Sequence, residues 1–593
     1  MTAAPERTAT AETTLRAVDP RLAYAFDAVM ERHPLLAWSW GLLKLDFTGM
    51  AFAGFFFCWS MTPSLLPRSW FFQGVVSGIT SAAGYGVGVV VGWFVYRRYL
   101  SKWHRWPPPP RVLLAIKLAI PVLTVVLGSI MIVAAARWQR QLADLMGAES
   151  PSTIGYFRAG VLAVLIGALL LTITRVLRDL ARLIARALRA GRVPRSLANV
   201  LAVAVVAFLL VGTAQIVLIQ AGMSLLNTEW STRNDATREG AVQPTAWERS
   251  GSPGSLVPWD TLGYQGRNFV SGGLTPAELS EANGAPAKTP IRLYVGLESA
   301  TDPEDRMQLL LAELDRTGAW DRRAIVVVPT TGTGWVNPTA VRAVETMFNG
   351  DTAIVATQYS YLPSSISFLT DRAKAEEAGS GLVHTVRNRL LMQPENRRPK
   401  LFVYGESLGT EAGEGAFADL SQIREQVDGV LWVGPPNANR IWSNYVQRRD
   451  PGTTEVQPTY AGGLLVRFAD SPEDIYRPNG PWLYPRVLYM QHPSDPVVWW
   501  SPRLLFQRPD WLEERPGFDR LPAMSWFPIV TFWQVTADLA NAAGVPDGHG
   551  HNYGSAVLDG WVAIAAPEGW SPADTERVRD AMEKYAPQDG PEK

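Results

Sequence analysis

Four long apolar stretches near the start of the chain constrain its fold more than any other feature. They cover roughly residues 71–96, 112–136, 157–174 and 197–220. A helix needs about 20 mostly apolar residues to cross the roughly 30 Å hydrocarbon core of a bilayer. A fifth stretch, 46–62, is shorter and could lie in the interface, but Trp59, Pro63 and Trp70 mark a membrane boundary if it spans. Residues 46–222 are therefore predicted to form an all-α transmembrane bundle of about five spans.

The charge of the chain divides at the same place. Residues 1–222 hold 22 Lys and Arg against 9 Asp and Glu, whereas the remaining residues hold 33 against 46. The zero formal charge of the whole chain therefore averages a basic part and an acidic part. This balance disfavours a nucleic-acid binder, and 47% hydrophobic residues disfavour disorder. With Cys58 as its single cysteine, the sequence contains no disulfide framework.

Basic residues are concentrated in alternate loops of the predicted bundle. They are frequent before the first span, after the second and after the fourth, where seven arginines lie in 175–195. The positive-inside rule places these three segments in the cytoplasm. We therefore expect residues 1–45 to form a cytoplasmic segment, the bilayer to be a partner of the bundle, and everything after about 222 to face the extracytoplasmic side.

The rest of the chain has the pattern of an α/β domain. Residues 223–260 are rich in Ser, Thr, Asn, Gly and Pro and are predicted to be a linker. In 261–593, short β-branched and aromatic runs alternate with helix-length stretches, which indicates a mainly parallel sheet. The expected strands are Ile291–Val295, Ala324–Val328, Thr352–Thr357, Leu401–Tyr404, Gly429–Val433 and Val487–Met490.

The sharpest chemical signal is the Gly-x-Ser-x-Gly motif of Gly405–Gly409. It follows the expected strand Leu401–Tyr404 and precedes a run of small residues suited to a helix start. This context is typical of a nucleophile elbow, in which the serine occupies a strained strand-to-helix turn and small neighbours let the backbone come close. Ser407 is therefore the predicted nucleophile.

A nucleophilic serine in an elbow of this kind needs a base and an orienting acid, which follow it along the chain in the order acid, then histidine. The glycine-rich loop Gly548–Tyr553 supplies His551 as the preferred base, with His549 as the alternative. Asp495, in a turn after the expected strand Val487–Met490, is the preferred acid. Asp470 is the alternative acid, because some members of this fold place the acid at the end of an earlier strand.

The oxyanion formed in such a reaction needs backbone N–H donors. We expect one from Leu408, directly after the nucleophile, and one from Thr331 or Gly332, in the glycine-rich turn after strand Ala324–Val328. An ordinary turn is the competing interpretation of that segment. A zinc site built from the histidines and aspartates of the two later loops is a further alternative, but it leaves the elbow unexplained. No cofactor and no metal is predicted.

Five segments together resemble one known family. They are Thr62–Arg68, Tyr294–Ala300, Gly405–Gly409, His492–Val497 and Gly548–Tyr553. Across nearly its whole length, the sequence resembles the actinobacterial membrane-anchored α/β-hydrolase family, in which a multi-helix N-terminal part precedes a C-terminal α/β-hydrolase domain. The resemblance implies a serine-hydrolase triad in a multi-pass protein of the bacterial cytoplasmic membrane, and it supplies no substrate, because a fold does not define a function.

Three functional hypotheses follow. The first is a membrane-anchored serine hydrolase of the esterase or lipase type, acting on lipid or cell-envelope acyl esters outside the cytoplasm. The second is an acyltransferase that uses the same residues but passes the acyl group to an alcohol. The third is a transporter or scaffold whose hydrolase-like domain is regulatory. Nucleic acid is not an expected partner, and the oligomeric state is left open.

Overall fold

A computed structural model describes residues 45–98, 110–150, 152–213, 233–362, 367 and 372–585. Most of the predicted N-terminal segment and the end of the predicted last span lie outside the described residues. The chain divides into two units. The helical unit contains the described residues up to Asp144, then Glu149–Leu183 and Ser525–Ala537, whereas the sheet unit contains Leu145–Ala148, Ile184–Met524 and everything from Asp538.

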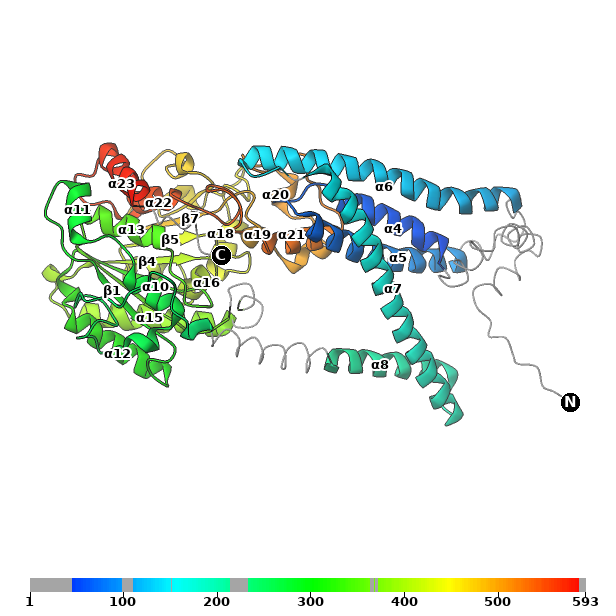
Figure 1. Cartoon of the computed structure of the whole chain (residues 1–593), viewed down its shortest axis with the longest axis horizontal. Coiled ribbons are helices and arrows are strands. Elements are labelled where there is room, and N and C mark those ends of the chain that lie inside the picture. Colours follow the sequence, from blue (N-terminus) through cyan, green and yellow to red (C-terminus); the bar gives the residue numbers. More distant parts are fainter. Residues whose placement is uncertain are drawn as a thin grey trace. The chain divides into compact units, whose positions relative to one another are not determined.

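The described residues of the N-terminal region contain five helices (Figure 1). They are α4 (Phe47–Ser60), α5 (Trp70–Arg98), α6 (Pro110–Met146), α7 (Thr153–Ala190) and α8 (Arg195–Thr213). Among the described residues, four helices are long and apolar enough to cross a membrane, and these four are α5 to α8. Helix α4 has 14 residues, which at 1.5 Å per residue is about 21 Å and thus shorter than the hydrocarbon core.

Glycines let helix α5 pack closely against two neighbours. A Cβ built on Gly84 would lie 2.6 Å from the Phe56 ring of α4, and one built on Gly88 would lie 2.6 Å from the Thr48 carbonyl oxygen. On another face of α5, a Cβ on Gly78 would lie 2.6 Å from Ile166 of α7. Small residues at four-residue spacing permit this approach of helix backbones. Helix α4 therefore runs antiparallel to α5 along much of the apolar length of α5.

The sheet unit is built on seven parallel strands. They are β1 (Ile291–Val295), β2 (Ala324–Pro329), β3 (Thr352–Thr357), β4 (Lys400–Glu406), β5 (Gly429–Val433), β6 (Val466–Ala469) and β7 (Arg486–Met490). Their order across the sheet is β1-β3-β2-β4-β5-β7-β6. Nearly every strand residue is buried, as expected where helices cover both faces of a parallel sheet.

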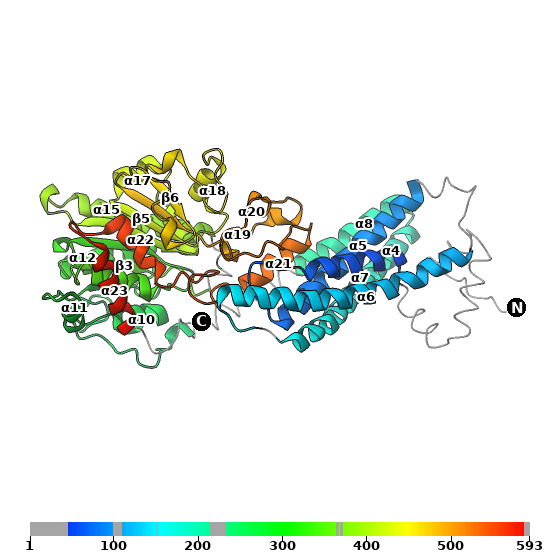
Figure 2. The same cartoon turned by 90° about the horizontal axis from the view of Figure 1, so that it is seen from above.

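Helices cover the two faces of this sheet (Figures 1 and 2). One face carries α12 (Pro303–Arg316), α15 (Arg372–Leu391) and α16 (Leu408–Glu414), and the other carries α13 (Pro338–Met347), α22 (Ala556–Ala565) and α23 (Pro572–Lys584). Further α-helices described in this unit, besides α8, are α10 (Gly263–Ser271), α11 (Pro276–Asn283), α17 (Leu420–Gln426), α18 (Arg440–Gln447), α19 (Pro496–Trp499) and α20 (Asp510–Glu513). Helix α21 (Val530–Leu539) begins within the helical unit.

The predicted α/β architecture is confirmed, and the six expected strands form within two residues of their predicted ends. Strand β6 was missed, because it has only four residues and includes Arg467, which breaks the apolar run. The guanidinium of Arg467 stacks over Trp482 at 4.7 Å, so a charged residue is tolerated in this edge strand.

The described part of the predicted linker, 233–260, packs on the sheet unit. Arg249 forms a parallel bridge with Arg292 of β1, and the hydroxyl of Ser250 accepts a hydrogen bond from the Tyr294 amide. Near the start of this segment, the Asn234 side chain accepts a hydrogen bond from Gln358 at 3.0 Å. The segment therefore extends the edge of the sheet next to β1.

Candidate active site

Ser407 lies in the turn between β4 and α16. Its backbone has φ 55° and ψ −130°, a conformation that non-glycine residues rarely adopt. The flanking glycines permit the turn, since a Cβ on Gly405 would lie 2.6 Å from the Gly409 carbonyl oxygen, and one on Gly409 would lie 2.5 Å from that of Pro329. The Ser407 amide donates to the Val433 carbonyl at 2.9 Å. The motif therefore has the backbone geometry of a nucleophile elbow.

Two loops that are 56 residues apart meet at Asp495 and His551. Asp495 directly follows β7 and its turn, and its Oδ2 lies 2.7 Å from Nδ1 of His551. The same Oδ2 accepts a hydrogen bond from the Tyr553 hydroxyl at 2.8 Å, while Oδ1 accepts from the Val497 amide at 2.8 Å. Asp495 is fully buried. These contacts hold the carboxylate in one orientation toward the imidazole.

The other ring nitrogen of His551 is left open. Among the described residues, Nε2 of His551 is buried without a hydrogen-bond partner. The ring lies against Gly434, where a Cβ would be 2.4 Å from Cε1, and Gly434 follows the residue that accepts the Ser407 amide. Burial disfavours the charged imidazole, but the charge of Asp495 and its hydrogen bond outweigh burial and raise the pKa of His551. A partly buried base with one unoccupied nitrogen is suited to proton transfer.

The glycine-rich turn after β2 adjoins the elbow and is firmly held. The Gly334 amide donates to the Thr331 carbonyl at 2.9 Å, and the Tyr294 hydroxyl donates to the Gly334 carbonyl at 2.9 Å. A Cβ on Gly332 would lie 2.2 Å from the Leu362 carbonyl oxygen, so the backbone requires glycine there. Leu408 is the first residue of α16, where helix amides have no partner within the helix. The expected oxyanion donors thus lie in segments that border Ser407.

Glu406, next to the serine, is a site residue that the sequence analysis missed. Its buried carboxylate accepts hydrogen bonds from the Tyr404 hydroxyl and from Nδ2 of Asn337, the latter at 2.7 Å. Burial raises the pKa of Glu406. Asn337 is the N-cap of α13 and follows the glycine-rich turn, so Glu406 links the elbow to that turn. The glutamate stands inside the motif, but nothing in the sequence indicates its partner.

His549 belongs to a second histidine–aspartate pair. Its Nδ1 lies 3.2 Å from Oδ2 of Asp519, which also accepts a hydrogen bond from the Ser494 hydroxyl at 2.5 Å. Ser494 in turn accepts the Gly550 amide at 2.8 Å. Asp519 is fully buried. This cluster connects the residue before Asp495 to the residue before His551. No sequence motif marks Asp519.

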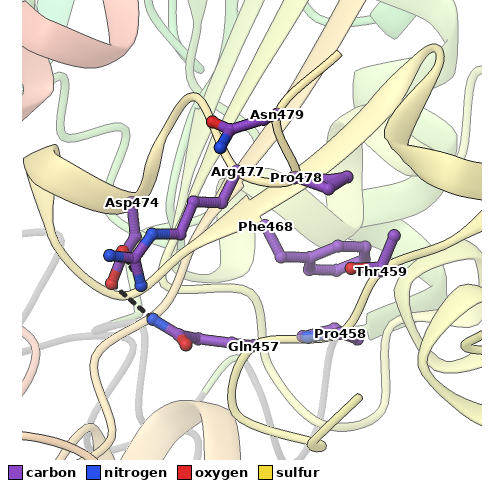
Figure 3. A pocket seen from close by; sticks show the side chains of 8 residues that line it. All are labelled: Gln457, Pro458, Thr459, Phe468, Asp474, Arg477, Pro478 and Asn479. Atoms are coloured by element: carbon purple, nitrogen blue, oxygen red, sulfur yellow. Dashed lines mark hydrogen bonds and ion pairs between the residues drawn. The ribbon is translucent and has the colours of Figure 1, made fainter. Parts of the chain in front are cut away.

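The alternative acid, Asp470, lies at the end of β6 with other partners. Its Oδ1 accepts a hydrogen bond from Nε2 of Gln457 at 2.5 Å, and the same nitrogen donates to Asp474. Burial raises the pKa of Asp470 to about 7. Gln457 and Asp474 line a cavity of about 350 Å³ together with Arg477 (Figure 3). Among the described contacts, His551 is paired with Asp495 and not with Asp470.

The residues considered for a zinc site are engaged elsewhere. The His492 ring stacks on Tyr553 at 4.1 Å, and its Nδ1 contacts the Gly550 carbonyl at 2.9 Å. Asp547 accepts a hydrogen bond from Asn552. In the described part of the chain, no group of three or more His, Cys, Asp or Glu side chains is placed to hold a metal ion.

Models of known families match both parts of the chain. One family model, described as an alpha/beta-hydrolase family, matches residues 291–578, and the model of that family's N-terminus matches 61–273. The chain belongs to this α/β-hydrolase family. Comparisons with curated proteins and with solved structures gave no match.

Membership in this α/β-hydrolase family covers both parts of the chain. The hydrolase match spans all seven strands and the loops of Ser407, Asp495 and His551. The N-terminal match begins at Met61, in the loop between α4 and α5, and ends at Gly273, within the residues that pack beside β1. The family's N-terminal match therefore includes residues of the sheet unit as well as the apolar helices.

Proposed function

We propose that this protein is a membrane-anchored serine hydrolase that cleaves carboxylic esters. The observation that carries the proposal is the position of the His551–Asp495 pair. The His551 ring, with its open Nε2, lies against Gly434, and Gly434 directly follows Val433, whose carbonyl accepts the amide of the strained Ser407. Family membership supports the reaction class.

In the proposed reaction, Ser407 Oγ attacks the ester carbonyl while Nε2 of His551 takes its proton. Asp495 holds the imidazole through Nδ1 and stabilises the positive charge that develops. The backbone N–H of Leu408, with that of Thr331 or Gly332, stabilises the oxyanion. His551 then protonates the departing alcohol, and water hydrolyses the acyl-enzyme by the same route in reverse.

The proposed substrates are lipid or cell-envelope acyl esters. Four helices able to cross a membrane would keep the enzyme at a surface where such esters are concentrated. The arginines of 175–195, which lie in the last part of α7 and up to the start of α8, favour a cytoplasmic location for this end of α7, so that the hydrolase domain faces the extracytoplasmic side.

Fluorophosphonate labelling of the detergent-solubilised full chain tests the chemistry. We expect the wild-type protein to be labelled and Ser407→Ala to lose the label, because only an activated serine reacts. Ser421→Ala, which removes an exposed serine, is the matched control and should label like wild type. A folded wild-type protein that stays unlabelled, or a Ser407→Ala protein that is labelled, would rule out the proposal.

Cysteine accessibility tests the orientation separately. In a Cys58→Ser background, a cysteine placed at Thr245, in the segment before β1, should react in intact cells with a thiol reagent that cannot cross the membrane. A cysteine placed at Ala190, at the end of α7, should react only after the cells are permeabilised. The reversed pattern would overturn the extracytoplasmic assignment and leave the proposed chemistry untouched.

A further inference from the structure

The glycine-rich turn after β2 (residues 330–334) packs on a buried glutamine. Gln358 directly follows strand β3 and is 2% exposed. Its Nε2 donates to the Thr333 carbonyl at 3.0 Å, and a Cβ built on Gly334 would lie 3.0 Å from its Cγ. The side chain of Gln358 therefore both contacts the turn and forms a hydrogen bond to its backbone.

Two further hydrogen bonds hold the ends of the same turn. Oγ1 of Thr330 donates to the Thr357 carbonyl at 2.7 Å, and the Tyr294 hydroxyl donates to the Gly334 carbonyl at 2.9 Å. Thr330 and Tyr294 are both buried. With its two ends fixed, the turn has the Gln358 amide as the polar contact at its middle, next to the expected oxyanion donors.

The Gln358 amide also reaches the predicted linker. Its Nε2 donates to Oδ1 of Asn234 at 3.0 Å, across 124 positions of sequence. Asn234 is buried, and the same oxygen accepts the Tyr264 amide at 3.2 Å. The beginning of the described linker segment is therefore two hydrogen bonds away from the glycine-rich turn.

Helix α10 holds Asn234 in place. The guanidinium of Arg267 donates to the Asn234 carbonyl, and to the Ala236 carbonyl at 2.6 Å. A Cβ built on Gly263, the first residue of α10, would lie 2.5 Å from Oδ1 of Asn234, so the close approach requires glycine there. All of these residues lie within the sheet unit. Asn234 is thus a fixed acceptor for the Gln358 amide.

The position of this turn matters because it borders the nucleophile elbow. A Cβ built on Gly409 would lie 2.5 Å from the Pro329 carbonyl oxygen and 3.5 Å from the Thr330 carbonyl carbon. A backbone N–H stabilises an oxyanion only when it is directed at the place where the negative charge develops. A small displacement of the turn therefore costs rate without changing the residues that react.

We propose that Gln358 and Asn234 set the position of the oxyanion donors: Gln358 binds the turn at Thr333, and Asn234 fixes the Gln358 amide. The inference rests on the proposed function, with Thr331 or Gly332 as a donor. It makes Gln358 and Asn234 positioning residues that act through the turn. It also gives the predicted linker a part in the reaction, and the family's N-terminal match includes this segment.

The test uses two variants of the full chain. Gln358→Met keeps the side-chain length but removes the donor, and Asn234→Ala removes its acceptor. Hydrolysis of a water-soluble p-nitrophenyl ester is measured per active site, with sites counted by fluorophosphonate labelling carried to completion. We expect kcat per site to fall about ten- to hundred-fold in Gln358→Met and several-fold in Asn234→Ala, with little change in KM, because donors displaced by up to about 1 Å lose rate on that order.

Inhibition by an aryl trifluoromethyl ketone separates positioning from stability. Oγ of Ser407 adds to the ketone carbon, the serine proton passes to Nε2 of His551, and the ketone oxygen becomes an oxyanion that needs the same donors as the ester reaction. The inhibition constant should therefore rise by about the factor by which kcat/KM falls. The acid limb of kcat/KM should keep its wild-type pH, since the His551–Asp495 pair is unchanged.

Matched controls report the effect of stability alone. Asn283→Ala removes a half-buried amide that attaches α11 to the Thr346 carbonyl of α13 at 3.1 Å, and Gln447→Met replaces an exposed glutamine of α18. A variant that is merely less stable has fewer labelled sites, but it keeps the wild-type kcat per site and inhibition constant. We expect both controls to behave in that way.

The outcomes distinguish this inference from the proposed function. If wild type is labelled at Ser407 but both variants keep the wild-type kcat per site, the inference is wrong and the proposed function stands. A fall in kcat per site without a matching rise in the inhibition constant also overturns the inference. If folded wild type is not labelled, the proposed function itself fails. Should Gln358→Met fail to fold, Asn234→Ala decides the inference by the same two measurements.

Discussion

The loop Gly548–Tyr553 carries two histidines that each contact a buried aspartate, and the two pairs differ in distance and in surroundings. His551 meets Asp495 at 2.7 Å, whereas His549 meets Asp519 at 3.2 Å. Asp495 also accepts hydrogen bonds from the Tyr553 hydroxyl and the Val497 amide, and Asp519 also accepts one from the Ser494 hydroxyl. Of the two histidines, His551 is the one whose ring lies against Gly434, which directly follows strand β5.

A histidine–aspartate contact does not by itself define a catalytic base. The pair at Asp519 connects two loops through Ser494 and Gly550. The pair at Asp495 directs a buried imidazole whose second nitrogen has no partner among the described residues. An imidazole nitrogen without a partner is available for proton transfer, whereas His549 and Ser494 both contact Asp519 and thereby hold two loops together.

The largest contrast is expected from replacing each histidine in turn. His551→Gln should lower ester hydrolysis on the order of 10⁴-fold, because a triad without its base retains only binding and oxyanion stabilisation. His549→Gln should cost about tenfold or less, since that ring only supports the loop. Turnover of a p-nitrophenyl ester per folded protein measures both. Equal losses would remove the distinction between the two pairs.

A smaller effect is expected at Gly434, which lies against the His551 ring. Gly434→Ala places a methyl group 2.4 Å from Cε1 of His551, so the ring must move and kcat should fall about 10²-fold. Gly452→Ala is the matched control, because Gly452 also has a positive φ but nothing within 4 Å. The control should lower the melting temperature slightly and leave kcat unchanged. Full activity of Gly434→Ala would contradict the position assigned to the base.

The smallest effect concerns the pH dependence set by Asp495 and Tyr553. Since the pKa of His551 is raised and the neutral imidazole is the active form, kcat/KM should increase as pH rises through a value above about 6.5. Tyr553→Phe removes a donor to Asp495 and strengthens its attraction for the imidazolium. The acid limb should therefore move to still higher pH, with a few-fold loss of kcat. A pH profile identical to that of wild type would show that Tyr553 does not tune the pair.

The local pattern of the sequence was sufficient to predict much of the fold. The strand and helix around Ser407 follow from an apolar run and a glycine-rich turn, and the six expected strands needed only short-range periodicity. Strand β6 escaped because Arg467 interrupts its pattern and is accommodated by Trp482 through a tertiary contact. The roles of Glu406 and Asp519 escaped for a related reason. Asn337, which links Glu406 to the glycine-rich turn, is 69 residues away, and the partners of Asp519 are at least 25 residues away.

The sequence by itself determined the apolar helices, the parallel sheet and the residue types and chain order of the proposed site, because these depend on composition and on spacing along the chain. The tertiary structure decided which of two histidines meets Asp495, and that Gln534 binds the loop after α4. Both depend on groups distant in sequence that approach within about 3 Å, and no local pattern specifies such a meeting.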